Sequence, residues 1–127
     1  MDRTTQTERG PVWAVVDKNP LLYQITVYVK VHLSERITLT TVADHFGVSV
    51  STVTQLFHKK ARITIHEYVT DCRMEKAQML ILRGRPLETV GKEVGYRDHS
   101  TFYRAFRQKY GVSPREYRKT ILQKEVN

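Results

Sequence analysis

The chain has 127 residues, 40% of them hydrophobic and 27% charged, with a formal net charge of +8. This length allows one compact domain or two very small ones, and it excludes an enzyme core with a separate regulatory domain. The single cysteine excludes a disulfide framework and a zinc site built from several thiolates. No apolar run approaches the roughly 20 residues that cross a bilayer, and no apolar stretch follows the first charges as it would in a signal peptide.

The basic charge is concentrated in the second half of the chain. Residues 1–60 carry seven Lys and Arg against five Asp and Glu, whereas residues 61–127 carry fourteen against eight. An excess of this kind predicts attraction to nucleic acid or to an anionic membrane surface. Charge alone does not decide between these partners.

The N-terminal region is polar apart from one short segment. We expect residues 1–19 to form a partly disordered arm, with an apolar patch at Val12–Asp17 that is either a strand or a segment laid against the core. Asn19 followed by Pro20 is typical of an N-cap and the first position of a helix. Apolar residues at helical spacing then predict a helix over residues 20–33.

Six further helices are predicted after residue 33. Their starts and ends are marked by capping residues, Gly and Pro, namely Thr38, Gly47, Ser49, Gly84–Pro86, Gly95, Asp98 and Ser113–Pro114. The residues expected to face inward in the seven helices are Leu22, Ile25, Val29, Leu33, Leu39, Val42, Ala43, Phe46, Val53, Leu56, Phe57, Ile65, Tyr68, Val69, Met74, Ala77, Leu80, Ile81, Leu87, Val90, Val94, Phe102, Ala105 and Phe106.

These elements predict an all-α fold of about seven helices in two helix-turn-helix subdomains. The first subdomain is expected over residues 20–70 and the second over residues 84–120, with a helix over residues 71–83 between them. The last helix is expected to be short and to be followed by a C-terminal tail over residues 121–127.

The chain also contains an internal repeat. Residues of the same type recur at an offset of 48 before the turn and 49 after it, in the pairs Val42 and Val90, Gly47 and Gly95, Thr52 and Thr101, Phe57 and Phe106, Lys60 and Lys109, Glu67 and Glu116, and Tyr68 and Tyr117. One residue has therefore been added in the second turn. Each copy has the helix-turn-helix layout, in which the second helix presents its outer face. Two copies in a basic chain favour DNA binding.

The second copy, GYRDHSTFYRAFRQKYGVSPREYR (Gly95–Arg118), resembles the C-terminal signature of the AraC/XylS family of bacterial transcription regulators. The segment RMEKAQMLI from Arg73 resembles the linker helix of that family, and LTTVADHFGVSVSTVTQLF resembles its first helix-turn-helix. The resemblance covers about residues 20–120, and the layout is similar to that of the short, stand-alone members. It implies two recognition helices that enter successive major-groove segments on one face of the DNA, and it favours activation through contact with RNA polymerase.

The resemblance also implies two sets of base-reading residues, which are the residues left outside once the apolar ones point inward. The first head, on the first recognition helix, is Ser51, Thr54 and Gln55, and the second head is His99, Ser100, Tyr103 and Arg104. Arg104 suits guanine, His99 can donate to the same acceptors, and Gln55 suits adenine, whereas Ser51 and Thr54 are short. We therefore expect Arg104 to anchor the second head and the first head to read more weakly.

Basic residues around the two heads are candidates for phosphate contacts, which position a protein on DNA without reading its sequence. They are Lys59, Lys60, Arg97, Arg107 and Arg115. As a set they predict a steep fall of affinity with salt.

Two residues depart from the pattern of the family. Arg62 stands where members commonly have Gly at the end of the first recognition helix, and a left-handed Arg costs about 1 kcal/mol. We therefore expect that turn to be built differently. Gly91 stands where Ala is usual, at a cost of about 1 kcal/mol unless close packing requires it.

No catalytic or metal site is predicted. The five histidines lack the spacing of metal ligands, and no phosphate loop, carboxylate pair or catalytic triad is recognisable, so we expect neither an enzyme nor a cofactor. Cys72 is expected to be a buried packing residue.

The sequence thus predicts a sequence-specific regulator that binds double-stranded promoter DNA as a monomer. We expect it to be an activator in the bacterial cytoplasm, associated with the nucleoid and not with a membrane. Two alternatives stay open. One is the DNA-binding output domain of a longer ligand- or signal-responsive regulator, and the other is a protein-interaction module that has lost base reading.

Overall fold

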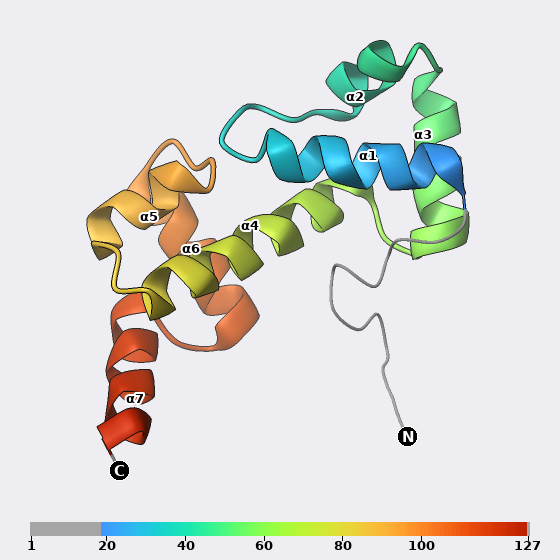
Figure 1. Ribbon diagram of the computed structural model, residues 1–127. Helices are drawn as coiled ribbons and strands as arrows, with labels where there is room; N and C mark the ends of the chain where they lie inside the picture. Colours follow the sequence, from blue (N-terminus) through green and yellow to red (C-terminus); the bar gives the residue numbers. More distant parts are fainter. Residues whose placement is uncertain (1–18, 127) are drawn as a thin grey trace, which may run out of the picture. The chain divides into compact units, whose positions relative to one another are not determined.

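A computed structural model of the chain describes residues 19–126, with side chains for residues 19–123. Within this range the chain has seven α-helices, one π-helical turn and no strand, which confirms the predicted all-α fold (Figure 1). The contacts divide the chain between Cys72 and Arg73 into two units. The predicted N-terminal arm, with its apolar patch Val12–Asp17, lies outside the described residues.

The first unit is formed by α1 (Pro20–Val31), α2 (Leu39–Phe46), α3 (Val50–Leu56), the π-helical turn η2 (Phe57–Ala61) and the first half of α4 (Ile65–Leu82). The Asn19 side chain accepts a hydrogen bond of 3.0 Å from the backbone N–H of Leu22, which confirms the predicted N-cap. The helix ends two residues earlier than predicted, but Leu33 is still buried.

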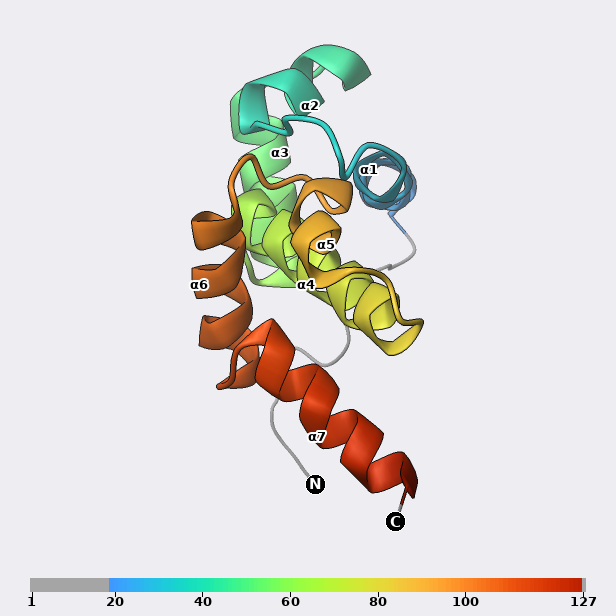
Figure 2. The same cartoon turned by 90° about the vertical axis from the view of Figure 1, so that its left-hand side faces the viewer.

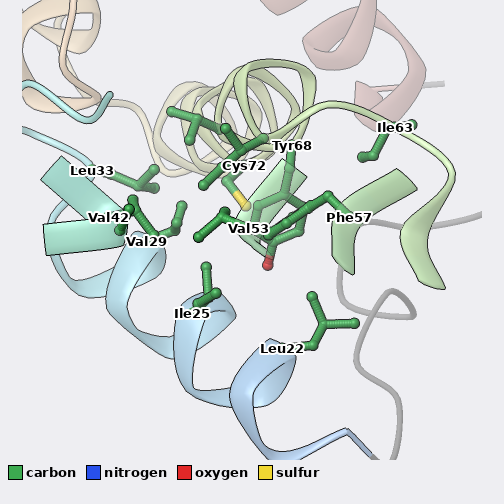
Figure 3. Packing of buried hydrophobic residues seen from close by; sticks show 13 residues of the cluster. Leu22, Ile25, Val29, Leu33, Val42, Val53, Phe57, Ile63, Tyr68 and Cys72 are labelled. Carbon is green, nitrogen blue, oxygen red and sulfur yellow. The ribbon is translucent and has the colours of Figure 1, made fainter. Parts of the chain in front are cut away.

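The core of the first unit is apolar and draws on every one of its helices (Figure 3). Leu22, Ile25 and Val29 of α1 are fully buried, as are Val53 and Phe57. The rings of Phe57 and Tyr68 lie 5.6 Å apart, so the end of the first recognition helix packs directly on α4. The half-buried positions among the predicted core residues, such as Leu39 and Leu56, pack against the edge of this cluster.

The first recognition helix ends in an unusual way. α3 continues into η2, where the backbone N–H of Arg62 donates to the carbonyl of Phe57, five residues earlier, at 2.7 Å. Arg62 itself has φ 62°, in the left-handed region that favours glycine. The expectation that this turn would avoid the left-handed conformation was therefore wrong, because Arg62 has the same kind of conformation as Gly111 at the end of α6. The two turns differ in the π-helical turn before Arg62, since the N–H of Gly111 donates to the carbonyl of Arg107, only four residues earlier.

The second unit is formed by the second half of α4 with α5 (Leu87–Glu93), α6 (His99–Tyr110) and α7 (Pro114–Val126), which follows α6 after a short turn (Figure 2). The expectation of a short last helix followed by a tail over residues 121–127 was wrong, because α7 has 13 residues and continues to Val126. No Gly or Pro follows Pro114 in the sequence, so nothing local ends the helix.

The segment predicted as a linker helix over residues 71–83 is the later part of a longer helix. α4 begins at Ile65 and has 18 residues. Its first residues, including Tyr68 and Val69, belong to the core of the first unit, whereas Met74 and Ala77 belong to the core of the second. One continuous helix thus contributes to both cores.

The core of the second unit is built on aromatic rings. Phe102 and Phe106 of α6 are fully buried and lie 5.9 Å apart. The ring of Phe106 also packs on Tyr117 of α7 at 5.5 Å, which repeats the contact between Phe57 and Tyr68 in the first unit. The Tyr117 hydroxyl accepts a hydrogen bond of 2.6 Å from the Gln78 side chain of α4.

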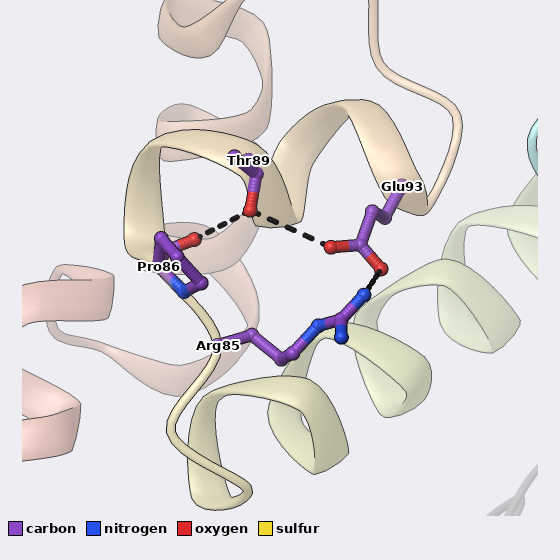
Figure 4. A network of polar contacts seen from close by, with 4 residues as sticks. All are labelled: Arg85, Pro86, Thr89 and Glu93. Atoms are coloured by element: carbon purple, nitrogen blue, oxygen red, sulfur yellow. Dashed lines mark hydrogen bonds and ion pairs between the residues drawn. The ribbon is translucent and has the colours of Figure 1, made fainter.

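A polar network holds α5 at the end of α4 (Figure 4). The guanidinium of Arg85 donates to the carboxylate of Glu93 at 2.8 Å, and Thr89 donates to the carbonyl of Pro86 at 2.9 Å. The guanidinium of Arg118, from α7, donates to the carbonyls of Ile81 and Arg85. The Ile81 carbonyl, at the end of α4, and the Arg85 carbonyl, in the turn before α5, thus each accept a hydrogen bond from α7.

The repeat seen in the sequence is also present in the backbone hydrogen bonds. In the first turn the N–H of Val48 donates to the carbonyl of Ala43 at 3.0 Å, and in the second the N–H of Tyr96 donates to the carbonyl of Gly91 at 2.9 Å. Both turns contain a left-handed glycine. The added residue of the second turn is accommodated between Tyr96 and Asp98, before the cap of α6.

Candidate nucleic-acid interface

The first head lies on the outer face of α3. Ser49 caps this helix by accepting a hydrogen bond of 3.0 Å from the backbone N–H of Thr52. Ser51, Thr54 and Gln55 are all exposed, while Val53 between them is fully buried. Their spacing of three and four residues places them on one helix face. The structure therefore brings the predicted reading residues of this head together.

The second head lies on the outer face of α6. Phe102 and Phe106 face the core, and His99, Ser100 and Arg104 are exposed. Tyr103 is half-buried, so only part of this residue is available to a partner. Arg104 lies four residues after Ser100, one helical turn further along the same face.

The carboxylate of Asp98 organises the start of α6. It accepts hydrogen bonds from the backbone N–H of Thr101 at 2.8 Å, from the Thr101 hydroxyl at 2.8 Å and from the Ser100 hydroxyl at 2.9 Å. These bonds, with the positive charge of Arg104, hold the pKa of Asp98 below its usual range. Because the Ser100 proton is directed to Asp98, this hydroxyl presents lone pairs, and not a donor, to a partner.

The imidazole of His99 is oriented by two rings of the same helix. Its centroid lies 6.2 Å from that of Phe102 and 6.3 Å from that of Tyr103. Phe102 is fully buried and therefore a fixed support. This arrangement limits the positions that His99 and Tyr103 can take before they meet a partner. The first head has no aromatic residue at the matching positions, Val50 and Thr54.

The five predicted phosphate-contacting residues are exposed in the structure. Lys59 and Lys60 lie on η2, at the end of the first recognition helix. Arg97 lies in the turn before α6, Arg107 on α6 itself, and Arg115 in the first turn of α7.

Two other arginines of the second unit contact groups of the protein itself. The guanidinium carbon of Arg73 lies 5.6 Å from the centre of the Tyr96 ring, and the side chain is half-buried. Arg118 contacts the carbonyls at the end of α4, as described above. Sequence reasoning did not assign these roles, because both residues contact groups that are distant in the sequence.

Within residues 19–126 no group of three His, Cys, Asp or Glu residues is placed to hold a metal ion. Cys72 is buried in the core of the first unit beside Tyr68 and Val69, where we expected a packing residue. The part of the chain that the structure describes contains no helix long and apolar enough to cross a membrane.

Comparison with known proteins identifies the family. A family model described as a helix-turn-helix domain matches residues 42–120. The probable transcriptional regulator LumQ of Photobacterium leiognathi is 34% identical over 91 residues, which cover 71% of this chain and 37% of LumQ. The arabinose operon regulatory protein of Escherichia coli K12 is 33% identical over 93 residues, which cover 72% of this chain and 32% of that protein. The matched region is thus about a third of the length of these regulatory proteins.

Solved structures agree with this assignment. The C-terminal domain of AraT, a response regulator from Geobacillus stearothermophilus, has a TM-score of 0.78 and 31% identity, and the match covers 83% of this chain and 88% of that domain. The DNA-binding domain of AdpA, solved in complex with a target DNA, has the same fold, with a TM-score of 0.74 and 23% identity over 81% of this chain and 93% of that domain. The chain belongs to the AraC/XylS family of helix-turn-helix transcription regulators.

Proposed function

We propose that the chain is a sequence-specific regulator of transcription that binds double-stranded DNA through two unequal reading heads. One observation carries this proposal. Each of the two units fixes a recognition helix by a buried ring, Phe57 or Phe106, that packs on a tyrosine, and leaves the predicted reading residues exposed, apart from the half-buried Tyr103. The DNA complex of AdpA, which has the same fold, supports DNA as the partner.

In the second head, Arg104 is proposed to anchor recognition. A guanidinium can donate two parallel hydrogen bonds to O6 and N7 of guanine in the major groove. His99 can add a further donor, and its ring is already supported by Phe102 and Tyr103. Ser100, whose proton is directed to Asp98, would accept a hydrogen bond from the amino group of adenine or cytosine.

In the first head, Gln55 is proposed to read adenine through two hydrogen bonds, while Ser51 and Thr54 offer a hydroxyl or a methyl contact. These short side chains reach less far than those of α6. We therefore propose that the first head tolerates more base changes than the second.

The exposed cations Lys59, Lys60, Arg97, Arg107 and Arg115 are proposed to contact phosphates on either side of the reading helices. Such contacts release counterions, so affinity falls steeply as salt rises. One chain carries both heads, and we propose that it binds each site as a monomer.

Selection of binding sites from random double-stranded DNA, carried out at two salt concentrations, tests the proposal. The expected result is an enriched motif with two half-sites about one helical turn apart, more strictly defined on the side read by α6. A Gln55→Ala and Arg104→Ala double variant, whose changes lie on exposed positions, is the matched control and should enrich no motif. Absence of enrichment with the unchanged chain would contradict the proposal and favour a protein-interaction module that has lost base reading.

Activation through RNA polymerase is the direction of regulation that the resemblance implies. A promoter carrying the selected motif upstream of a reporter gene distinguishes activation from repression. A purified transcription reaction with RNA polymerase then shows whether a direct contact is sufficient.

A DNA-binding output domain of a longer regulator is the second candidate. It is favoured by the C-terminal domain of the response regulator AraT, which this chain matches over 88% of that domain. The reporter strain distinguishes the two candidates. Regulation of the reporter gene by this chain alone supports the first candidate, whereas DNA binding without regulation supports the second.

A further inference from the structure

The first unit contains an open groove next to α3, and two of its lining residues, Thr54 and Gln55, also belong to the first head. The groove has a volume of about 720 Å³. It is lined by residues of three short segments, residues 37–39 at the start of α2, residues 54–58 on α3 and η2, and residues 62–69 around the start of α4. All of them belong to the first unit.

The lining of this groove is mostly apolar. Its walls are formed by the side chains of Ile37, Leu39, Ile63, Ile65 and Val69. The last three are buried, so they form a fixed floor, and the first two are half-buried at one edge. A groove of this size and lining is typical of a site for a small molecule. The apolar residues of the lining do not suit DNA, because protein surfaces that bind DNA are polar and strongly positive.

One guanidinium and two imidazoles supply hydrogen-bond donors at the groove. Arg62, His58 and His66 line it, and all three are exposed. The single carboxylate in the lining, Glu67, accepts hydrogen bonds from the backbone N–H of Thr64 at 2.9 Å and from its hydroxyl at 3.3 Å. This carboxylate is thus engaged in the cap of α4, whereas the guanidinium of Arg62 and the imidazoles of His58 and His66 present N–H donors to a ligand.

From these observations we propose that the groove binds a small amphipathic anion, with an apolar ring or chain and one carboxylate or sulfonate group. The apolar part would lie against Ile37, Leu39 and Ile65. The anionic group would lie against the guanidinium of Arg62, and the imidazoles of His58 and His66 would offer further hydrogen-bond donors.

This site has a consequence for DNA binding, which rests on the proposed function. Thr54 and Gln55 line the groove and are also reading residues of the first head. A ligand in contact with them occupies space that a base edge would need. The ligand therefore weakens DNA binding through the first head.

The site is tested without DNA by fluorescence titration of the full chain with two probes that share an apolar body. The first probe is 1-anilinonaphthalene-8-sulfonate, and the second is N-phenyl-1-naphthylamine, which lacks the sulfonate. The expected result is that Arg62→Gln weakens binding of the sulfonate about fivefold, as for a partly exposed ion pair, and leaves binding of the neutral probe unchanged. Lys60→Gln is the matched control, since Lys60 is exposed on the same turn and does not line the groove.

A second pair of variants tests the apolar wall. Ile37→Glu places a carboxylate in the groove and should weaken binding of the sulfonate probe by about tenfold or more. Val31→Glu makes the same change at an apolar residue of α1 that is 70% exposed and outside the groove, and should have no effect. Should Ile37→Glu alter the circular dichroism spectrum, Ile37→Ser serves in its place. The proposed site would be overturned if the variant and its control in each pair had equal effects. It would also be overturned if both probes bound equally to every variant.

The effect on DNA is tested separately, with the motif obtained by site selection. The sulfonate probe should weaken binding of that DNA to the unchanged chain and not to the Ile37→Glu variant. If no motif is selected, the proposed function fails, while the fluorescence titrations still decide whether the groove binds an anion. If the probe binds the groove and DNA affinity does not change, the site stands and the competition with the first head is wrong.

Discussion

Gly91 of α5 and Phe102 of α6 lie so close together that a Cβ atom on the glycine would be 3.1 Å from both Cβ and Cγ of the phenylalanine. This contact explains why Gly is present where the family usually has Ala. By the offsets of the repeat, the matching residues of the first unit are Ala43 and Val53. The second unit thus has a smaller residue opposite a larger one, and the two differences compensate for each other.

We predict that Gly91→Ala lowers the free energy of unfolding by about 1 kcal/mol. Overpacking costs about 1–3 kcal/mol, and the better helix propensity of Ala returns about 1 kcal/mol. Phe102 cannot easily move away, because it is fully buried and packs on Tyr96 and Phe106. Urea unfolding followed by far-ultraviolet circular dichroism measures the change. The exposed neighbour Lys92→Ala is the control and should leave stability within about 0.5 kcal/mol.

The double variant tests whether the two residues compensate. Phe102→Val alone should cost about 2–4 kcal/mol through the cavity that it leaves. Combined with Gly91→Ala it should cost less than the sum of the two single changes, by about 1 kcal/mol, since the added methyl group then has room. Strict additivity would show that the close approach of these residues does not determine the choice of Gly.

Arg62 provides a test of backbone strain. A left-handed Arg costs about 1 kcal/mol relative to Gly, so Arg62→Gly should raise the free energy of unfolding by about that amount. Lys60→Gly should lower the free energy of unfolding by about 1 kcal/mol. Lys60 lies inside η2, where a glycine relieves no strain and only adds conformational entropy to the unfolded chain. Both changes remove one exposed positive charge, so a difference in sign reports on the backbone and not on electrostatics.

Arg104 and Arg97 should differ in their effect on DNA binding. Arg104→Ala should weaken binding to the selected motif by about 1–3 kcal/mol and relax one base position. Arg97→Ala should weaken binding to all sequences alike and reduce the slope of log affinity against log salt by about 1. Affinities measured on the motif and on its single-base variants, at several salt concentrations, separate the two effects. An unchanged base preference in Arg104→Ala would show that this residue does not read the sequence.

Asp98 should make stability depend on pH. Its pKa is lowered in the folded chain, first by the backbone N–H of Thr101, so its contribution is present above the unfolded pKa, near about 4, and is lost as the pH falls through the folded value. Asp98→Ala should therefore destabilise the chain at neutral pH, with a difference that shrinks in acid.

The matched control for Asp98 is Asp98→Ser, which copies the cap of α3 at Ser49. It keeps an N-cap without a titrating group, so its stability relative to the unchanged chain should improve as the pH falls. Thermal unfolding at a series of pH values measures both variants. A constant difference between Asp98→Ala and the unchanged chain across the acid range would mean that the carboxylate contributes no charge-dependent bond.

Most of the helices, and the outward position of the two heads, followed from the sequence because the signals are local. A cap such as Asp98 bonds a residue three positions away, and the alternation of Phe102 and Phe106 with Tyr103 and Arg104 assigns the faces of α6 within two turns. The end of α7 was missed, since residues 121–126 carry neither a break nor a strong apolar pattern. The half-burial of Tyr103 was also missed, because it depends on the surroundings of the helix and not on its period.

The sequence by itself determined the class of fold, the repeat, the family and the residues that face outward, because helix periodicity, caps and glycine turns act over a few residues. Only the tertiary structure decided which residues far apart in the chain contact one another. The contact of Gly91 with Phe102, the bonds of Arg118 to carbonyls more than 30 residues earlier, and the groove built from residues 37–39, 54–58 and 62–69 all join segments that are separate in the chain. Close approach and cavities depend on how such segments pack against one another, and the sequence of a single segment does not determine that packing.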